Sequence, residues 1–226
     1  MPELRIEPEF IVEEPHVMLM SRCSQPEALD IIERVGRTCY QSKNLIGEGS
    51  AEKFLEARLY QDHHDSLLEH YVVTVAFYCD RGVANQITRH RLCSFAQTST
   101  RYVNYSKEKF GSKIACIPPP FLSDGGWNRW VEACNEAQRQ YMEMLKEGET
   151  PEIARSVLPF SLSTELCATA NLREWRHFFN LRTSSRAHPQ MREIAYMLLS
   201  LFNSTIPIFF KDIEPELVID GSIEED

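Results

Sequence analysis

Glycine is scarce in this sequence, and the glycines present fall in no nucleotide-binding order. Nine of the 226 residues are glycine, well below the ~7% usual for globular proteins. None belongs to G-x-G-x-x-G or to G-x-x-x-x-G-K-[ST], the loops whose backbone N–H groups hold phosphates. A Rossmann or P-loop site is therefore disfavoured, and any phosphate recognition must come mainly from side chains.

Paired cysteines and long apolar runs are also missing. The seven cysteines are odd in number, widely spaced and never in a C-x-x-C arrangement, which predicts reduced thiols rather than a disulfide framework or a zinc ribbon. No apolar run approaches the ~20 residues needed to span a bilayer, and residues 1–4 (MPEL) lack the character of a secretion signal. We therefore expect a cytoplasmic protein with no membrane association.

The net charge is negative but unevenly distributed. The formal charge of -9 argues against non-specific nucleic-acid binding, which requires many Lys and Arg residues to neutralise phosphates. Seven acidic residues and no base follow Lys211. We expect one domain over residues 1–211 and a solvated acidic tail over residues 212–226.

Apolar periodicity outlines an α+β domain. Strands are predicted at 16–22, 71–79 and 161–169 from β-branched and aromatic runs. Helices are predicted from a Ser24-x-x-Glu27 capping box through Cys39, and at 50–61, 81–92, 127–146, 152–157, 172–183 and 189–205. Because strands and helices mix without regular β-α alternation, the fold class is α+β.

Two long windows contain arginine but no acidic residue. Residues 81–107 hold Arg81, Arg89, Arg91 and Arg101, and residues 175–192 hold Arg176, Arg182, Arg186 and Arg192. Such arginines can be ordinary surface residues that pair with distant acids, or they can converge on a bound anion. Arginine is favoured where a phosphate or carboxylate is bound through two parallel hydrogen bonds.

Residues 86–102 (QITRHRLCSFAQTSTRY) favour the anion-site interpretation. Neighbours on one helix face are three or four residues apart, so Arg89, His90 and Arg91 must point in different directions and can serve two ligands. The Ser/Thr-rich loop that follows and ends at Arg101 suits a phosphate monoester, with each charge-assisted hydrogen bond contributing about 1.5–3 kcal/mol.

These residues resemble a known family. Arg89-His90-Arg91, seven residues and then Ser99 is similar to the R-H-R-x7-S signature of flavin-dependent thymidylate synthases. Residues 64–70 (HDSLLEH), 154–159 (ARSVLP) and 171–182 (NLREWRHFFNLR) follow the other segments of that family in the same order. The resemblance covers roughly residues 16 to 210.

The resemblance implies a single domain with helices around a small, mainly antiparallel sheet. It implies methylation of dUMP to dTMP with methylenetetrahydrofolate as carbon donor, non-covalent FAD as the hydride source, NADPH as reductant and no metal. It also implies a homotetramer with active sites at subunit interfaces and no nucleic-acid partner.

The same resemblance assigns roles to individual residues. Arg182 would polarise the pyrimidine and is the expected catalytic residue. The expected flavin contacts are Ser66, Glu69, Arg89, His90, Arg91, Gln97, Asn171, Arg173 and His177. The expected dUMP contacts are Gln86, Arg89, Gln97, Ser99, Thr100, Arg101, Arg155 and Arg182.

The sequence departs from the family pattern at two places. Ala96-Gln97 stands where many members have Asn-Glu, so a role that needs a carboxylate is lost there. His177 stands where some relatives have Asn, and unlike Asn it can titrate. We expect both changes to affect affinity or pH dependence rather than the reaction.

Other interpretations of individual residues compete with these roles. Cys93, beside the arginines, is a candidate nucleophile, although most free cysteines are small buried hydrophobic residues. Ser99 is expected to bind phosphate, since no base adjoins it. His63, His64 and Asp65 form no standard metal motif.

Two alternative functions follow from these features. One is a metal-dependent nucleotide phosphohydrolase built on His64 and Asp65. The other is a non-catalytic RNA-binding module in which Phe95, Tyr102 and Tyr105 are stacking platforms.

Overall fold

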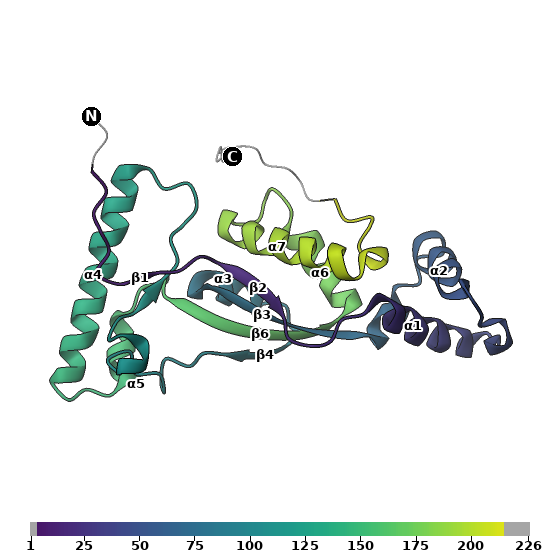
Figure 1. Cartoon of the computed structure of the whole chain (residues 1–226), viewed down its shortest axis with the longest axis horizontal. Helices are drawn as coiled ribbons and strands as arrows, with labels where there is room; N and C mark the ends of the chain where they lie inside the picture. The colour runs from purple at the N-terminus through teal and green to yellow at the C-terminus, as the bar shows by residue number, and fades with distance from the viewer. Residues whose placement is uncertain (1–3, 215–226) are drawn as a thin grey trace.

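The computed structural model describes residues 4–214 and places a four-stranded sheet at the centre of the molecule (Figure 1). The strands lie in the order β2 (His16–Leu19), β3 (Val72–Asp80), β6 (Ser163–Asn171) and β4 (Ser94–Gln97), and every neighbouring pair is antiparallel. The predicted α+β class and the three predicted strands are confirmed, with small shifts at their ends. The sequence pattern misses β4, because this strand is short and its one large apolar side chain is Phe95.

One face of the sheet is packed against helices. Along β6 the residues alternate strictly between buried and half-buried, as expected when one face meets a core. Helices α6 (Leu172–Arg182) and α7 (Pro189–Thr205) lie over this face (Figure 1), both close to their predicted bounds. Trp175, Phe178, Phe179, Phe202 and Phe210 form edge-to-face contacts with ring centroids 5.1 to 5.7 Å apart. Each such contact contributes about 0.5–1.5 kcal/mol beyond burial, so α6 is firmly fixed against α7 and Phe210.

Helix α3 (Arg81–Ile87) follows β3 directly and is shorter than predicted. Asp80 caps it by accepting a hydrogen bond from the Val83 backbone N–H at 2.8 Å. The prediction of helix up to residue 92 is wrong. The backbone N–H groups of Arg89 and His90 donate to the carbonyls three residues earlier, so the chain tightens into a turn and leads into β4.

A second cluster of buried residues lies at one end of the molecule, under α4 (Asp124–Lys146). This helix packs against α5 (Pro151–Ala154) and the short 3-10 helix η5 (Arg155–Val157). The parallel pair β1 (Ile11–Val12) and β5 (Ala115–Cys116) adds Cys116 to the same cluster. The helix starts three residues before its predicted bound, because the Ser123 hydroxyl accepts a hydrogen bond from the Gly126 N–H at 3.1 Å. The predicted short helix at 152–157 is present as α5 followed by η5.

Helices α1 (Gln25–Cys39) and α2 (Ser50–Leu55) form the opposite end (Figure 1). A π-helical segment, η2 (Glu56–Gln61), continues α2 to the predicted end. The predicted capping box is wrong in detail, because the Ser24 side chain makes no cap bond and the Ser24 N–H donates to the Tyr71 hydroxyl at 3.2 Å.

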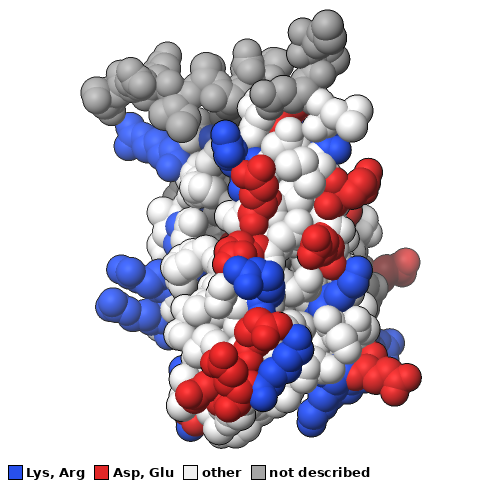
Figure 2. Space-filling view, turned by 90° about the vertical axis from the view of Figure 1, so that its left-hand side faces the viewer, with Lys and Arg blue, Asp and Glu red and all other residues white. Residues whose placement is uncertain are grey.

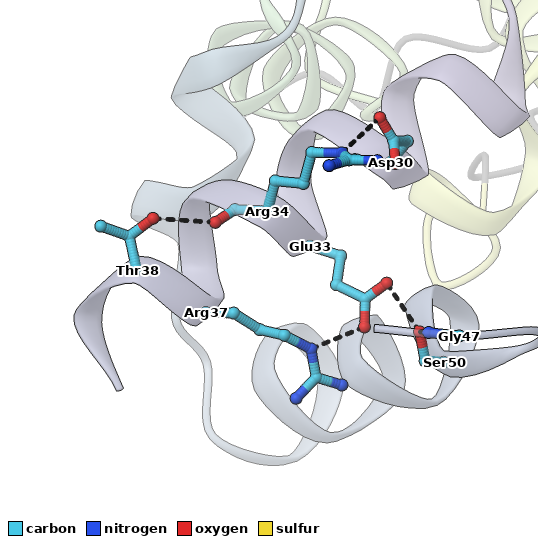
Figure 3. A network of polar contacts seen from close by, with 7 residues as sticks. All are labelled: Asp30, Glu33, Arg34, Arg37, Thr38, Gly47 and Ser50. Carbon is cyan, nitrogen blue, oxygen red and sulfur yellow. Dashed lines mark hydrogen bonds and ion pairs between the residues drawn. The ribbon is translucent and has the colours of Figure 1, made fainter. Parts of the chain in front are cut away.

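A buried carboxylate joins α1 to α2. Glu33 is 3% exposed and accepts hydrogen bonds from Arg37 Nε at 2.7 Å and Ser50 Oγ at 2.8 Å (Figure 3). The Arg37 guanidinium also stacks 5.0 Å from the Phe54 ring centroid. Both Glu33 oxygens are therefore partnered, as a buried charge requires.

Charges of both signs are interspersed on the end of the molecule that α4 forms (Figure 2). Along α4, Arg129, Arg139 and Lys146 each pair with a glutamate three residues away. This face therefore offers no uniformly basic surface of the kind that nucleic acids need.

All seven cysteines are free thiols, which confirms the prediction of reduced cysteines. No helix within residues 4–214 is long and apolar enough to cross a membrane. At the start of the expected acidic tail, Asp212 pairs with Arg176 at 2.5 Å and Ile213 is buried. The rest of that segment, residues 215–226, lies outside the described residues.

Candidate functional site

The turn after α3 spreads the three residues of the Arg-His-Arg sequence. His90 is 4% exposed, whereas Arg89 and Arg91 are both exposed. The three side chains therefore diverge as expected, although they do so from a turn and not from a helix. His90 packs on Phe178 of α6, with ring centroids 5.0 Å apart, which fixes the turn against that helix.

A cavity of about 700 Å³ opens where this turn, α6 and the 3-10 helix η3 (Asp65–His70) meet. We call it the arginine cavity. It is lined by Glu69, Arg89, His90, Arg91, Leu92, Asn171, Arg173, Glu174, His177, Leu181 and Arg182. Of the residues expected to contact a flavin, Ser66 and Gln97 are the two that do not line it. Segments separated by 79 or more positions in the sequence thus converge as the family resemblance implies.

The arginine cavity carries more positive than negative charge. Four arginines line it, against two glutamates. Glu69 pairs with Arg173 at 2.5 Å, and both side chains are about half exposed, so this pair adds little stability. An anion in the cavity would meet the remaining arginines, and the cavity volume lies within the ~300–1,000 Å³ typical of small-molecule sites.

A buried histidine connects the other glutamate to an arginine. His90 Nδ1 lies 3.2 Å from Glu174 Oε1, and Arg182 Nε donates to His90 Nε2 at 3.0 Å. Arg182 Nη2 also donates to the Gln86 carbonyl at 3.1 Å. Burial, followed by the charges of Arg182 and His177, lowers the pKa of His90 to about 4, so its ring is neutral at pH 7.

Burial also shifts the pKa of Arg182 and of the nearby Cys93 thiol. Desolvation, and then Arg89, lower the pKa of Arg182, but an arginine remains charged at neutral pH. Burial, and then Glu174, raise the pKa of Cys93 to about 12. A thiol with that pKa is protonated, and it is a poor nucleophile.

One group of potential metal ligands occurs within residues 4–214, and it lies in the arginine cavity. The ligand atoms of His90, Glu174 and His177 are within 4.8 Å of one another. However, both ring nitrogens of His90 already have partners, and the Arg182 cation is one of them. A divalent ion there would have to displace a guanidinium, which makes these residues a poor fit for a metal. The His63, His64 and Asp65 considered in the sequence belong to no such group in the described chain.

A second cavity, of about 640 Å³, adjoins the first. It lies between α3, the start of α7 and the cluster under α4, and its lining includes Gln86, Arg89, Trp130, Phe160 and Gln190. Arg89 lines both cavities. A ligand in either one can therefore contact the same guanidinium.

The rest of the expected dUMP contacts form a separate cluster. Arg155 Nη1 donates to Thr100 Oγ1 at 3.4 Å, and Arg101 Nε pairs with Glu152 at 2.6 Å. Ser99 precedes them in the same loop, and none of these residues lines either cavity. Gln97 lies on β4, where its side chain donates to Thr164 Oγ1 at 3.3 Å. Within one chain, the expected dUMP residues are thus divided between the cavities and this loop.

Sequence reasoning missed Glu174, Leu92 and Leu181 as lining residues. Glu174 lies three residues after Asn171 and three before His177, a helical spacing that places all three on one face. Leu92 is 80% exposed and Leu181 is 48% exposed, so both offer apolar surface at the cavity. Among the stacking residues considered for RNA, Tyr102 is exposed, but Tyr105 is buried in the cluster under α4.

Comparisons with known proteins agree on one family. Residues 19–208 match the Thy1 family, described as thymidylate synthase complementing protein. A flavin-dependent thymidylate synthase of Pyrococcus furiosus is 33% identical over 171 residues, which cover 75% of this chain and 69% of the relative.

Two solved structures have the same fold. Thymidylate synthase X from Helicobacter pylori, with FAD and dUMP, superimposes with a TM-score of 0.72 at 20% identity, covering 88% of this chain and 98% of that one. The UMP/dUMP methylase PolB from Streptomyces cacaoi, bound with 5-Br dUMP, gives a TM-score of 0.73 at 23% identity, covering 89% and 95%.

Proposed function

The chain belongs to the Thy1 family of flavin-dependent thymidylate synthases, and on this premise we propose that it methylates dUMP to dTMP. The observation that carries the proposal is the pair of adjoining cavities that share Arg89, one of them lined by four arginines. Methylenetetrahydrofolate is the carbon donor and NADPH the reductant.

The arginine cavity suits a non-covalent FAD. Arg89 and Arg91 offer forked donors for a pyrophosphate, and Arg173, paired with Glu69 through Nη1, can add a further N–H donor. The exposed side chains of Leu92 and Leu181 offer apolar surface for a flat ring. When bound, FAD supplies the hydride that completes the new methyl group. Glu69, Asn171 and His177 complete the lining. His90 is a wall residue of the cavity, and both its ring nitrogens are engaged by protein.

Ser66 and Gln97 are kept as proposed flavin contacts from the resemblance alone. They line neither cavity of this chain, and they become flavin contacts if the cofactor extends beyond the lining or meets a second protomer.

Arg182 provides the charge that activates the pyrimidine. Its guanidinium is held by His90 and Gln86 at the cavity wall, so the orientation is set before the substrate binds. A fixed cation beside the pyrimidine stabilises the negative charge that develops as C5 becomes nucleophilic. Such a donor changes rates by about 10²–10³. No activated thiol is needed, which agrees with the raised pKa of Cys93.

The dUMP site is proposed to form between protomers of a homotetramer. Gln86, Arg89 and Arg182 lie at the cavities, whereas Ser99, Thr100, Arg101 and Arg155 belong to the other cluster, and Gln97 lies on β4. In a symmetric contact, the cavity residues of one protomer meet the loop residues of a second protomer, and the loop residues of the first meet the cavity residues of its neighbour. Residues 1–211 are proposed as the catalytic domain and residues 212–226 as an acidic C-terminal tail.

The first experiment tests for a flavin and for the reaction. Purified protein is expected to be yellow, to be bleached by NADPH faster when dUMP is present, and to form dTMP when methylenetetrahydrofolate is added. UMP is the matched control substrate, because PolB is described as acting on UMP as well as dUMP. Metal-dependent phosphate release from dUMP would instead support the phosphohydrolase. Oligonucleotide binding that falls steeply with salt would support the RNA-binding module.

The second experiment tests the shared site. Arg182→Ala and Arg155→Ala protomers, each inactive alone, are co-expressed in equal amounts. If each site takes one residue set from each of two protomers, random pairing restores about a quarter of wild-type activity. If all the residues come from one protomer, the mixture remains as inactive as its parents.

A further inference from the structure

The geometry around Arg182 determines which nitrogen of His90 carries the proton. An arginine has five N–H donors and no acceptor, so His90 Nε2 must offer a lone pair to Arg182 Nε at 3.0 Å. The neutral ring then carries its hydrogen on Nδ1, and that N–H can only donate to Glu174 Oε1 at 3.2 Å. The three side chains thus form one hydrogen-bonded row, in which Arg182 donates to His90 and His90 donates to Glu174.

Glu174 is placed for this contact by the start of α6. The Asn171 side chain caps the helix by accepting a hydrogen bond from the Glu174 N–H at 2.9 Å. The Glu174 side chain is 5% exposed, and within residues 4–214 the one hydrogen bond found for it is the bond to His90. A buried carboxylate with a single partner is costly unless that partner is held firmly, so Glu174 and His90 constrain each other.

Within residues 4–214, no direct hydrogen bond or ion pair joins Glu174 to Arg182. The two residues are eight positions apart on α6, a rise of about 12 Å. The His90 ring lies over Phe178, midway between them, and fills that gap from the turn after α3. Helix α6 therefore contributes the two outer side chains, Glu174 and Arg182, and the Arg-His-Arg turn contributes His90 between them.

We propose that Glu174 is a positioning residue, which acts through neutral His90 to hold the Arg182 guanidinium at the cavity wall. The inference rests on the proposed function only in naming Arg182 as the cation that faces the pyrimidine. No contact of Glu174 with substrate or flavin is required.

The charged groups around His90 determine how the hydrogen-bonded row of Glu174, His90 and Arg182 responds to pH. His90 faces Glu174, His177 and Arg182 from α6, and Arg89 and Arg91 adjoin it in the chain. Protonation of His90 would remove the acceptor for Arg182 and place a cation beside it. We therefore expect turnover to decline in acid when His90 becomes charged.

The first test examines the structural half of the proposal without any assay of function. Wild-type protein with ¹⁵N-labelled histidine is expected to show His90 with hydrogen on Nδ1 and none on Nε2 across neutral pH, the signals being assigned with His90→Gln. Hydrogen on Nε2, or titration near the ordinary histidine pKa of ~6.5, would overturn the proposal even if the protein is an active synthase.

The second test separates positioning from substrate binding. In Glu174→Ala, kcat is expected to fall at least tenfold, while flavin content and the dUMP dissociation constant change less than threefold. Glu174→Gln, whose amide oxygen can still accept from Nδ1, is expected to recover most of the turnover. Glu33→Gln is the matched control, because it removes another buried carboxylate charge that lines neither cavity.

The outcomes are distinguishable. Wild-type kcat in folded Glu174→Ala refutes the positioning role, and so does an equal loss of dUMP affinity and kcat. If Glu174→Ala does not fold, Glu174→Gln and the histidine spectrum decide. If the wild-type protein makes no dTMP, the proposed function fails while the spectrum still tests the hydrogen-bonded chain.

Discussion

Replacement of Arg182 by alanine is the perturbation whose consequences the structure defines most fully. Two of the five guanidinium N–H groups are used within the protein, by His90 Nε2 and by the Gln86 carbonyl. Within residues 4–214, no hydrogen bond is found for Nη1. At least two N–H groups therefore remain for a ligand in the arginine cavity, which Arg182 lines.

The expected loss has two parts that different measurements separate. Removing a donor directed at developing charge costs about 2.7–4 kcal/mol, or 10²–10³ in kcat. Removing the same side chain also leaves His90 Nε2 unpaired, at about 1–3 kcal/mol if water cannot reach it, whereas the Gln86 carbonyl still accepts from the Arg89 backbone N–H. Because Arg182 is only partly buried, water can replace part of the second loss, so we expect a modest decrease in the free energy of unfolding.

Steady-state kinetics with dUMP, together with thermal unfolding, is the appropriate assay. A cation that acts mainly in the transition state predicts that kcat and kcat/KM fall together. Arg182→Lys retains the charge but not the planar fork, and we expect it to be more active than Arg182→Ala and well below wild type. Arg186→Ala is the matched control, because Arg186 is an exposed arginine of the same acid-free window and lines neither cavity.

One result would refute this reasoning. If folded, flavin-containing Arg182→Ala turns over at the wild-type rate, the guanidinium does not stabilise the transition state. If instead only KM rises, Arg182 binds substrate uniformly and has no catalytic role.

Three further predictions concern separate parts of the molecule. Arg101→Ala should weaken dUMP binding by about 10–100-fold, the loss of one charge-assisted hydrogen bond, as measured by calorimetry with Arg129→Ala of α4 as control. An unchanged dissociation constant would exclude Arg101 from the phosphate site. Because the folded-state pKa of His90 is about 4 and the unfolded value is ~6.5, the folded state binds fewer protons. Stability should therefore fall as the pH drops from ~6.5 to ~4, by up to about 3 kcal/mol, and pH-dependent unfolding of His90→Gln should show a shallower decline. Gly36→Ala should lower the free energy of unfolding by about 1–3 kcal/mol, because the new Cβ would lie 2.5 Å from the Phe54 ring. Phe54→Leu in the same chain should reduce that loss, and a denaturant series that shows additive effects would disprove the steric explanation.

The sequence by itself determined the element types and most of the candidate site residues. β-branched and aromatic residues predicted β3, and the strand predicted at 161–169 is present as β6, where the structure shows the strict burial alternation of one buried face. The resemblance of the Arg-His-Arg sequence and of the segments around Glu69 and Asn171 to a known family predicted most of the residues that line the arginine cavity.

Only the tertiary structure decided how these residues act on one another. Nothing local distinguishes the end of α3 at Ile87 from a helix that continues, since the turn is fixed by packing of His90 on Phe178. The chain from Glu174 through His90 to Arg182 joins residues 84 and 92 positions apart. Its proton arrangement follows from burial and from an arginine that cannot accept a hydrogen bond. Sequence periodicity reports which face of an element is buried, but contacts between distant segments depend on how those faces meet.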